Sequence, residues 1–560
     1  MVAPTIFAVN FVIQLKYISI IKIKYYSYIY NMKKSNFINN IIVLMFSQVI
    51  IKVTGFIYKI YLTNKQGFGD TGNAIYSAGF QVYAILLTLS SIGIPNAISK
   101  MVSSKFAIGD YKGAYRILKI AVMLFSFIGF VASIFLYVFS KPISNNLLQI
   151  PESELSLQLL APSIFLVSVA SVFRGYFNGA GNIKITAKSQ NLEQISKTII
   201  TIIIVEVIAI ISDFNTTFMA AAATAGTTIA TIFSTVYLYI LYKKNKKNIW
   251  GTIRNNNFNN EKCSLIIKNI LLVTIPISFS AFLSVATKSV DSLTIIRILK
   301  TYMKTEEAKR LYGILSGKID TLVILPLSFN IALSTTLVPT IASLIAKGKK
   351  KEANNKIRLS LLISLLIGLP CTAIMIIYSE EILNILFPNA MEGAYMLQIS
   401  SIEIIPLVLI QTVNGALQGI GRAKECVKAL LIGLIIKIIL NIFLLSVKKI
   451  GIYGAIISSN ICHWVTLIIC LVKLNKESNL FSIIKIDIIK VVFATSAMSL
   501  ISYLCYTNIL RFLNFQAALV IATITGILIY FMLIIILKLF PKDIILPKTY
   551  GEKLLKKSRT

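Results

Sequence analysis

Apolar stretches longer than about 18 residues recur along the sequence from Phe37 to Phe540, and each is long enough to cross a bilayer as a helix. About fourteen such spans would account for roughly half of the 560 residues. Only 14% of the residues are Asp, Glu, Lys or Arg, whereas soluble proteins carry about 25%. The sequence therefore predicts an all-helical integral membrane protein with about fourteen transmembrane helices and no large soluble domain.

Basic residues are concentrated in the loops on one side of this predicted topology. The net charge is +34, which in a soluble protein would favour nucleic-acid binding. In membrane proteins, however, Lys and Arg collect in cytoplasmic loops, and here they cluster at 100–116, 243–264, 346–358 and in the C-terminal tail. We therefore expect no nucleic-acid partner and expect both termini to lie in the cytoplasm.

A set of glycines and a lysine recurs 240 positions later in the chain. The repeat matches Gly175, Gly179, Gly181 and Lys197 with Gly415, Gly419, Gly421 and Lys437. The offset covers six predicted spans, and because six is even, the two halves should have the same orientation in the membrane. Parallel repeats of this kind favour a transporter with its substrate site between two pseudo-symmetric six-helix lobes.

The repeat and the basic segments together predict the domain organisation. Residues 1–31 precede a basic, start-like Met32-Lys33-Lys34 and are interpreted as an upstream extension. The expected parts are an N-terminal extension at 1–36, an N-lobe at 37–242, a basic cytoplasmic linker at 243–264, a C-lobe at 265–473, two further helices at 474–540 and a basic cytoplasmic tail at 541–560.

The sequence contains no motif of a common enzyme class, such as a P-loop, HExxH or GxSxG. We therefore predict a non-enzyme with no catalytic residue. The six cysteines show no CxxC spacing, and His463 is the only histidine, interpreted as a buried core residue. These features predict neither a metal site nor a cofactor.

Ionisable residues inside the apolar spans are the main functional candidates, because they are costly in lipid and usually face a bundle interior or a wet cavity. Lys52 and Lys59 lie two helical turns apart in the first span and share one face. Lys52 lies near mid-span and is predicted to face a cavity. Lys59 is predicted either to face the same cavity or to extend to the membrane interface.

The seventh and eighth spans supply the other candidates for an anion-binding cavity. These are Lys288, Arg297, Lys318 and Asp320. Lys288 and Asp291 are three residues apart and could instead neutralise each other. Arg297 could simply mark the outer end of its span.

Three carboxylates are candidates for coupling transport to an ion. Asp291, Glu206 and Glu403 lie inside apolar spans, where a carboxylate can carry a proton. Lys197 and Lys437 are predicted to form structural ion pairs, with Glu193 one turn from Lys197. Pro276 interrupts the overlong seventh span, and because proline bends a helix, we predict that it acts as a hinge.

Several segments resemble the flippases of the multidrug/oligosaccharidyl-lipid/polysaccharide (MOP) superfamily. The resemblance is carried by Gly55 to Tyr58, by Leu86 to Lys100, by Arg174 to Gly179, and by Leu325-Pro326 with Val338-Pro339. It extends over about residues 33–540 and is strongest to the stage V sporulation protein B group and the Gram-positive lipid II flippases.

The resemblance implies two six-helix lobes forming a V with two additional helices in the bacterial plasma membrane. It implies translocation of an undecaprenyl-pyrophosphate-linked saccharide, with membrane lipids and other cell-wall synthesis proteins as partners. A pyrophosphate needs cationic groups in a low-dielectric site, and the family pattern assigns this role to Lys52. The chain departs from the lipid II flippases at Tyr58 and Thr321, where they carry arginine, so a sporulation or polysaccharide-export role stays open.

Three other functions are compatible with parts of the sequence. A cation–drug antiporter of the same superfamily would have a cavity rich in carboxylates, whereas this chain places mainly lysines in its spans. A membrane scaffold would recruit cell-wall enzymes through the basic loops. A membrane-embedded glycosyltransferase is disfavoured because no acidic metal-binding motif is present.

Overall fold

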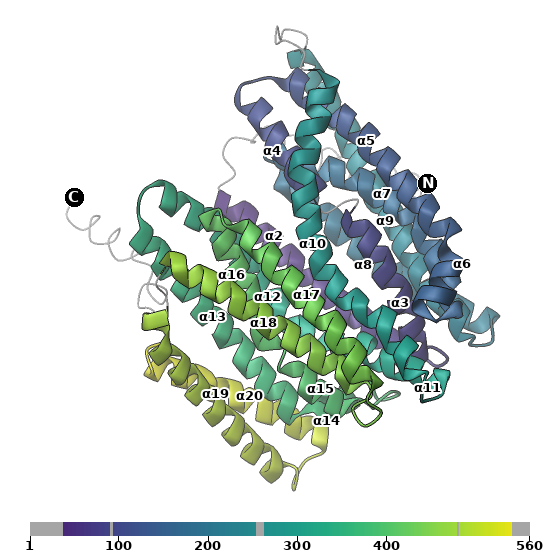
Figure 1. Ribbon diagram of the computed structural model, residues 1–560, viewed down its shortest axis with the longest axis vertical. Helices are drawn as coiled ribbons and strands as arrows, with labels where there is room; N and C mark the ends of the chain where they lie inside the picture. The colour runs from purple at the N-terminus through teal and green to yellow at the C-terminus, as the bar shows by residue number, and fades with distance from the viewer. Residues whose placement is uncertain (1–36, 90–92, 254–261, 479–480, 540–560) are drawn as a thin grey trace, which may run out of the picture.

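The computed structural model describes residues 37–89, 93–253, 262–478 and 481–539 of the chain (Figure 1). The predicted extension at 1–36 and the basic tail lie outside the described residues. Within those residues all regular elements are helical, which confirms the predicted fold class. The long helices are α2 (Phe37–Asn64), α3 (Gly69–Leu87), α4 (Ile94–Ala107), α5 (Tyr111–Val138), α7 (Glu154–Gly179), α8 (Ile183–Ile211), α9 (Thr216–Ile253), α10 (Cys263–Leu299), α12 (Asp320–Ala346), α13 (Lys350–Ile377), α16 (Ile404–Ile420), α17 (Ala423–Ser446), α18 (Tyr453–Ser478), α19 (Phe481–Ile509) and α20 (Phe515–Ile536).

Short helical segments connect several of these long helices. They are α6 (Ser140–Pro142), η2 (Ile143–Leu148), η3 (Pro151–Ser153), α11 (Thr305–Gly313), η4 (Ile314–Ile319), α14 (Ser379–Leu386) and α15 (Ala394–Ser401). The η4 segment is π-helical and joins α11 and α12 into one helical run. Such π-helical turns are rare and frequently mark functional sites.

Twelve helical runs in the described residues are long and apolar enough to cross a membrane. They coincide with the third to fourteenth predicted spans, so the chain is a multi-pass membrane protein. The first predicted span corresponds to α2. The second, predicted as one helix at 74–99, is wrong in detail, because α3 ends at Leu87 and α4 begins separately at Ile94. The Pro95 ring lies in the first turn of α4, a position that suits a helix start better than a helix interior.

The long helices pack into two groups, with α19 and α20 lying outside the second (Figure 1). We call α2–α9 the N half and α11–α18 the C half. In the N half, α7 packs against α4, α5 and α9, and α8 packs against α2 and α9. In the C half, α16 packs against α12, α13 and α18. Helix α19 contacts α13, where the Tyr378 hydroxyl forms a 2.8 Å hydrogen bond with the Ser502 hydroxyl.

The repeated glycines make the same kind of helix contact in both halves. A Cβ atom on Gly175 would lie 2.9 Å from the Pro95 Cα atom on α4. A Cβ atom on Gly415 would lie 2.8 Å from the carbonyl oxygen of Ser334 on α12. The third glycine of each motif, Gly181 or Gly421, has a positive φ (+79° and +88°) just after the helix, where glycine avoids the strain of a side chain. The sequence repeat is therefore a structural repeat.

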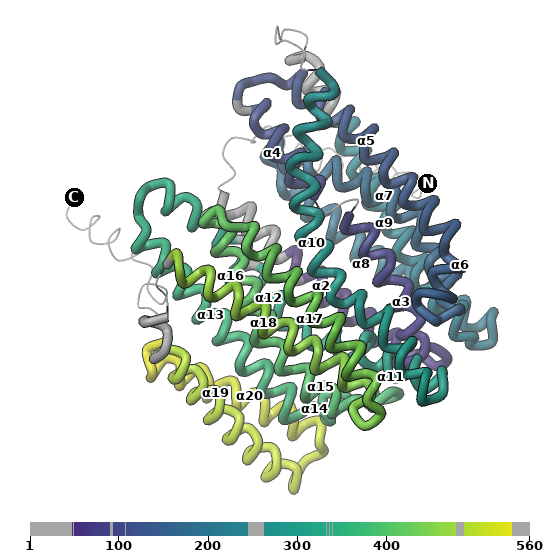
Figure 2. The backbone as a smooth tube through the Cα atoms, viewed as in Figure 1, coloured from purple at the N-terminus to yellow at the C-terminus, as the bar shows by residue number. Residues whose placement is uncertain are grey.

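Helix α10 belongs to both halves, as its path in Figure 2 shows. Near its N-terminus, Ile266 and Ile270 join a hydrophobic cluster formed with α4, α5 and α7. Near its C-terminus, Ile295 and Ile296 join the large cluster that includes the C half. Pro276 lies within the helix between these two contact regions. This placement fits the predicted hinge, whose movement remains a prediction.

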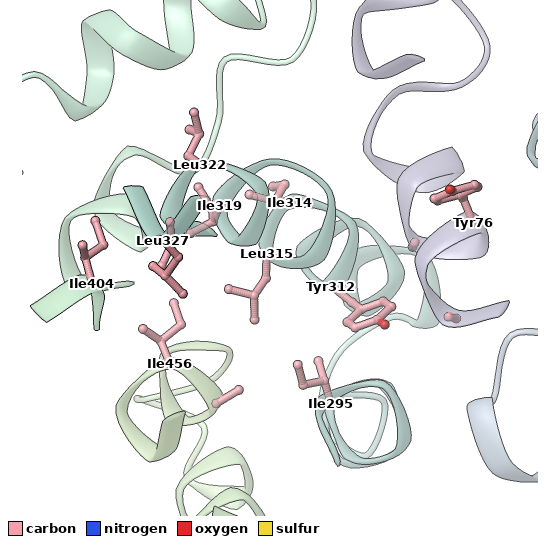
Figure 3. Packing of buried hydrophobic residues seen from close by; sticks show 14 of the residues in the cluster. Tyr76, Ile295, Tyr312, Ile314, Leu315, Ile319, Leu322, Leu327, Ile404 and Ile456 are labelled. Atoms are coloured by element: carbon pink, nitrogen blue, oxygen red, sulfur yellow. The ribbon is translucent and has the colours of Figure 1, made fainter. Parts of the chain in front are cut away.

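The two halves also meet where α3 packs against α11 and η4, a contact we call the α3–η4 seam. Small residues allow the close approach, because a Cβ atom on Gly313 would lie 1.8 Å from the Asp70 carbonyl oxygen and one on Gly317 would lie 2.5 Å from Asn73 Cγ. Figure 3 shows the buried side chains around this region, including Tyr76 from α3 and Tyr312 beside η4.

Candidate functional site

The two lysines of α2 lie in different environments. Lys52 is partly exposed, and no carboxylate of the described residues lies within ion-pair distance of it. Its charge is close enough to that of Lys288 on α10 for the two to repel each other. Lys59, by contrast, is only 6% exposed. The structure therefore leaves Lys52 as a partly accessible cation within a membrane helix and places Lys59 in the protein interior, not at the interface.

Lys59 lies in a cluster of aromatic rings together with Lys197 from α8. Lys59 Nζ is 4.7 Å from the centre of the Tyr76 ring. Lys197 Nζ is 5.4 Å from the centre of the Tyr58 ring and 4.9 Å from that of Phe80, and it donates a 3.2 Å hydrogen bond to the Tyr76 hydroxyl. These separations are within the range of cation–π attraction. We call these five residues the Lys59–Lys197 cluster.

The carboxylate predicted for Lys197 is engaged elsewhere. Glu193 accepts a 2.5 Å hydrogen bond from Nη2 of Arg174, whose guanidinium also donates to the Ser189 and Ser234 hydroxyls. The predicted Glu193–Lys197 pair is therefore wrong. Arg174 is 7% exposed and requires a counter-charge, which explains why it takes the glutamate.

Lys288 pairs across the helix bundle and not along its own helix. Its Nζ lies 2.9 Å from Asp320 Oδ1 on α12, and both side chains are about 30% exposed. The pairing of Lys288 with Asp291 considered from the sequence is therefore wrong. Helix α10 turns Asp291 toward α17, where another lysine is available.

Lys437 is the lysine that Asp291 contacts. Lys437 is 1% exposed, and its Nζ lies 2.6 Å from Asp291 Oδ2. Asn441 donates to Asp291 Oδ1 at 2.9 Å and to the Thr294 hydroxyl at 3.0 Å, and it accepts a hydrogen bond from Ser458. The predicted structural pairing of Lys437 is confirmed, with both charges satisfied by a network.

Lys318 joins the two halves at the α3–η4 seam. It is fully buried, and its Nζ donates to Asp70 Oδ2 at 3.0 Å and to the carbonyl oxygen of Ala390 at 2.7 Å. Asp320, two residues later, faces α10 instead. Arg297 lies at the end of α10 and donates to the Asn146 carbonyl oxygen at 2.6 Å, which is a second link between the halves. Both side chains are thus engaged within the protein, Lys318 at the seam and Arg297 at the end of α10.

The other two coupling candidates, like Asp291, have partners that the sequence did not indicate. Glu206 accepts hydrogen bonds from Tyr61 and from Lys65, the latter at 2.5 Å. Glu403 lies 2.8 Å from Nδ1 of His463, and both side chains are nearly buried. Each carboxylate is thus held by a group from another helix. The aromatic residues around Lys59 were also missed as a cluster, although Tyr58 is part of the segment that carries the family resemblance.

Within the described part of the chain, no three His, Cys, Asp or Glu side chains come together as they would around a metal ion. Three of the lysines predicted from the sequence instead form ion pairs between helices. The pairs are Lys288–Asp320, Lys318–Asp70 and Lys437–Asp291. Of the lysines predicted from the sequence, Lys52 and the two lysines of the Lys59–Lys197 cluster have no carboxylate partner among the described residues.

The fold and the charged groups define a multi-pass, all-helical membrane protein built from two related halves. A family model described as polysaccharide biosynthesis protein matches residues 37–345, more than half of the chain. The chain belongs to this family. A second model, MatE, matches residues 313–443.

Two curated relatives from Bacillus subtilis (strain 168) match most of the chain. Stage V sporulation protein B is 24% identical over 437 residues, which cover 76% of this chain and 80% of the relative. Lipid II flippase MurJ is 24% identical over 467 residues, which cover 79% of this chain and 83% of the relative. These matches agree with the resemblance seen in the sequence.

Solved structures share the fold at low sequence identity. Lipid II flippase MurJ in an inward closed conformation gives a TM-score of 0.66 at 16% identity, covering 88% of this chain and 98% of that chain. An inward-facing multidrug resistance MATE family transporter of the MOP superfamily gives a TM-score of 0.62 at 13% identity. The match covers 79% of this chain and 99% of that chain. The chain therefore has the MOP superfamily fold.

Proposed function

We propose that the protein is a flippase that moves an undecaprenyl-diphosphate-linked saccharide from the inner to the outer leaflet of the bacterial plasma membrane. The observation that carries the proposal is Lys52, a partly exposed cation within a membrane helix with no carboxylate partner among the described residues. An unneutralised lysine in a low-dielectric region attracts a diphosphate strongly. Lys288, whose charge acts on Lys52, is itself paired with Asp320 at 2.9 Å, so Lys52 is the cation left available to the diphosphate.

The arrangement of the halves supports alternating access as the mechanism. The two halves are joined at the α3–η4 seam, and α10 connects them through its length. With both termini in the cytoplasm, as the basic loops predict, this seam lies on the outer side of the membrane. In our proposal the halves rock about α10, the seam opens to release the head group, and the lipid tail stays in the bilayer.

The relatives support the choice of cargo. One is named a lipid II flippase and another a stage V sporulation protein, so we propose a cell-wall precursor, with spore cortex peptidoglycan as one destination. Other cell-wall synthesis proteins are the proposed partners. A cation–drug antiporter is less well supported, because it would need carboxylates free to bind a cation. Partners from other helices already hold Asp291, Glu206 and Glu403.

Transport by a Lys52→Ala variant tests the proposal. The purified protein would be reconstituted in vesicles that carry a fluorescent undecaprenyl-diphosphate disaccharide, and its arrival in the outer leaflet would be measured. We expect the initial rate to fall about tenfold, equivalent to about 1.4 kcal/mol of lost binding to the diphosphate.

Lys449→Ala is the matched control, because Lys449 is an exposed lysine in the loop before α18. An unchanged rate in Lys52→Ala would remove Lys52 from the site. Absence of transport by the unaltered protein, together with transport of a cationic dye, would favour the antiporter and refute the flippase.

A further inference from the structure

The lysine repeat leaves one of its two members without a counter-charge. In the C half, Lys437 is neutralised by Asp291 at 2.6 Å. In the N half, no carboxylate of the described residues lies within ion-pair distance of Lys197, because Glu193 is held by Arg174. Lys59, from the facing helix α2, has no carboxylate partner among the described residues either, although it is more than nine-tenths buried.

The aromatic rings of the cluster stabilise these two cations without consuming their capacity to bind an anion. Tyr58, Tyr76 and Phe80 present their faces to the ammonium groups at 4.7–5.4 Å. An ammonium group has three N–H donors, and Lys197 uses one of them on the Tyr76 hydroxyl. Two like charges held near the same ring repel each other, so an anion between them would be favoured by both.

The position of the cluster along α2 indicates which part of the cargo would reach it. Lys59 follows Lys52 by seven residues, a rise of about 10 Å along the same helix face. It is also nearer to the α3–η4 seam, since Thr63, near the end of α2, accepts a 2.9 Å hydrogen bond from Asn73 of the seam. A cargo with its diphosphate at Lys52 would therefore extend its saccharide toward Lys59.

We propose that the Lys59–Lys197 cluster is a second anion site, which binds a carboxylate carried on the saccharide of the cargo. This inference rests on the proposed function and specifies its substrate class: the cargo is an acidic lipid-linked saccharide, with a negative group beyond the diphosphate. The carboxylate of the substrate would fill, beside Lys197, the counter-charge role that Asp291 fills beside Lys437 in the C half.

Binding of two synthetic lipids to the full-length protein in nanodiscs tests the inference. One is an undecaprenyl-diphosphate disaccharide with neutral sugars, and the other carries a uronic acid in the same position. We expect the unaltered protein to bind the acidic lipid about tenfold more tightly. In Lys197→Gln this preference should fall to about one, whereas Lys52→Gln should weaken both lipids and retain the preference.

Two further variants keep the result interpretable. Lys59→Gln should also abolish the preference and replaces Lys197→Gln if that variant does not fold, while Lys197→Arg should retain it. Equal binding of both lipids by the unaltered protein, or a full preference in both glutamine variants, overturns the second site and leaves the flippase proposal intact. If the unaltered protein binds neither lipid, the flippase proposal itself is overturned.

Discussion

Lys197 and Lys437 occupy equivalent positions in the two halves, yet their surroundings differ completely. Lys437 is part of a network in which Asp291, Asn441, Thr294 and Ser458 satisfy one another. Lys197 contacts aromatic rings and a hydroxyl group. A repeat can thus preserve helix packing while its polar residues diverge. In the C half the lysine is neutralised by a carboxylate of the protein, whereas in the N half the lysine remains available to an external anion.

The largest expected effect is a loss of folding stability when the ion pair of the C half, Asp291–Lys437, is broken. Asp291→Asn leaves Lys437 charged and fully buried, and removing one partner of a buried pair costs about 3–5 kcal/mol. The corresponding N-half change, Lys197→Met, removes cation–π contacts worth about 0.5–1 kcal/mol and one hydrogen bond to the Tyr76 hydroxyl worth about 1 kcal/mol. Denaturant unfolding of the two purified variants in detergent would measure this contrast.

The double variant Asp291→Asn/Lys437→Met should recover most of the lost stability, because it removes both charges. Asp213→Asn is the control, since Asp213 is exposed between α8 and α9. Equal destabilisation by Asp291→Asn and Lys197→Met would contradict the conclusion that only Lys437 depends on a buried carboxylate partner.

A smaller effect is expected from Pro276→Ala, which would stiffen the one helix shared by the halves. Alanine restores the backbone hydrogen bond that proline lacks and favours a straight helix. We expect the rate of lipid transport to fall about tenfold, about 1.4 kcal/mol in the barrier, with little change in the affinity for cargo. Pro370→Ala is the control, because Pro370 lies inside α13, which belongs to one half alone. Transport unaffected by Pro276→Ala would exclude the hinge.

The smallest effect is expected when a carboxylate is added to the N half. Gln194→Glu places a negative charge three residues from Lys197 on α8, where an i, i+3 pair can form. The added carboxylate should partly neutralise Lys197, as Asp291 neutralises Lys437, and so lower the preference for the acidic lipid about twofold. Gln190→Glu, farther along the same helix, serves as the comparison. A preference that increased in Gln194→Glu would contradict an anion site at Lys197.

The helices and their repeat could be predicted because both depend on local sequence. Apolar length determines a membrane span, and Gly175 with Gly415 indicates close helix contact wherever the partner helix lies. The break after Leu87 was missed, although Ser90, Ser91 and Gly93 interrupt the apolar run there. Pro95, in a position that suits a helix start, is a further signal of a second helix.

The ion pairs could not be predicted in the same way, because each is decided by how helices distant in sequence are rotated. Lys288 has Asp291 within reach along its own helix, yet bundle packing turns it toward Asp320 on α12. Glu193 is likewise taken by Arg174. The sequence therefore identifies which charged residues lie in the membrane spans, whereas the packing of the helices determines which of them form ion pairs.

The α3–η4 seam has a consequence for the energetics of opening. Lys318 is fully buried against Asp70, so a dry separation of the halves would leave two bare charges, whereas entering water would solvate both. Opening should therefore be coupled to wetting of the seam. Osmolytes that are excluded from protein surfaces would then favour the closed state and slow the transport cycle.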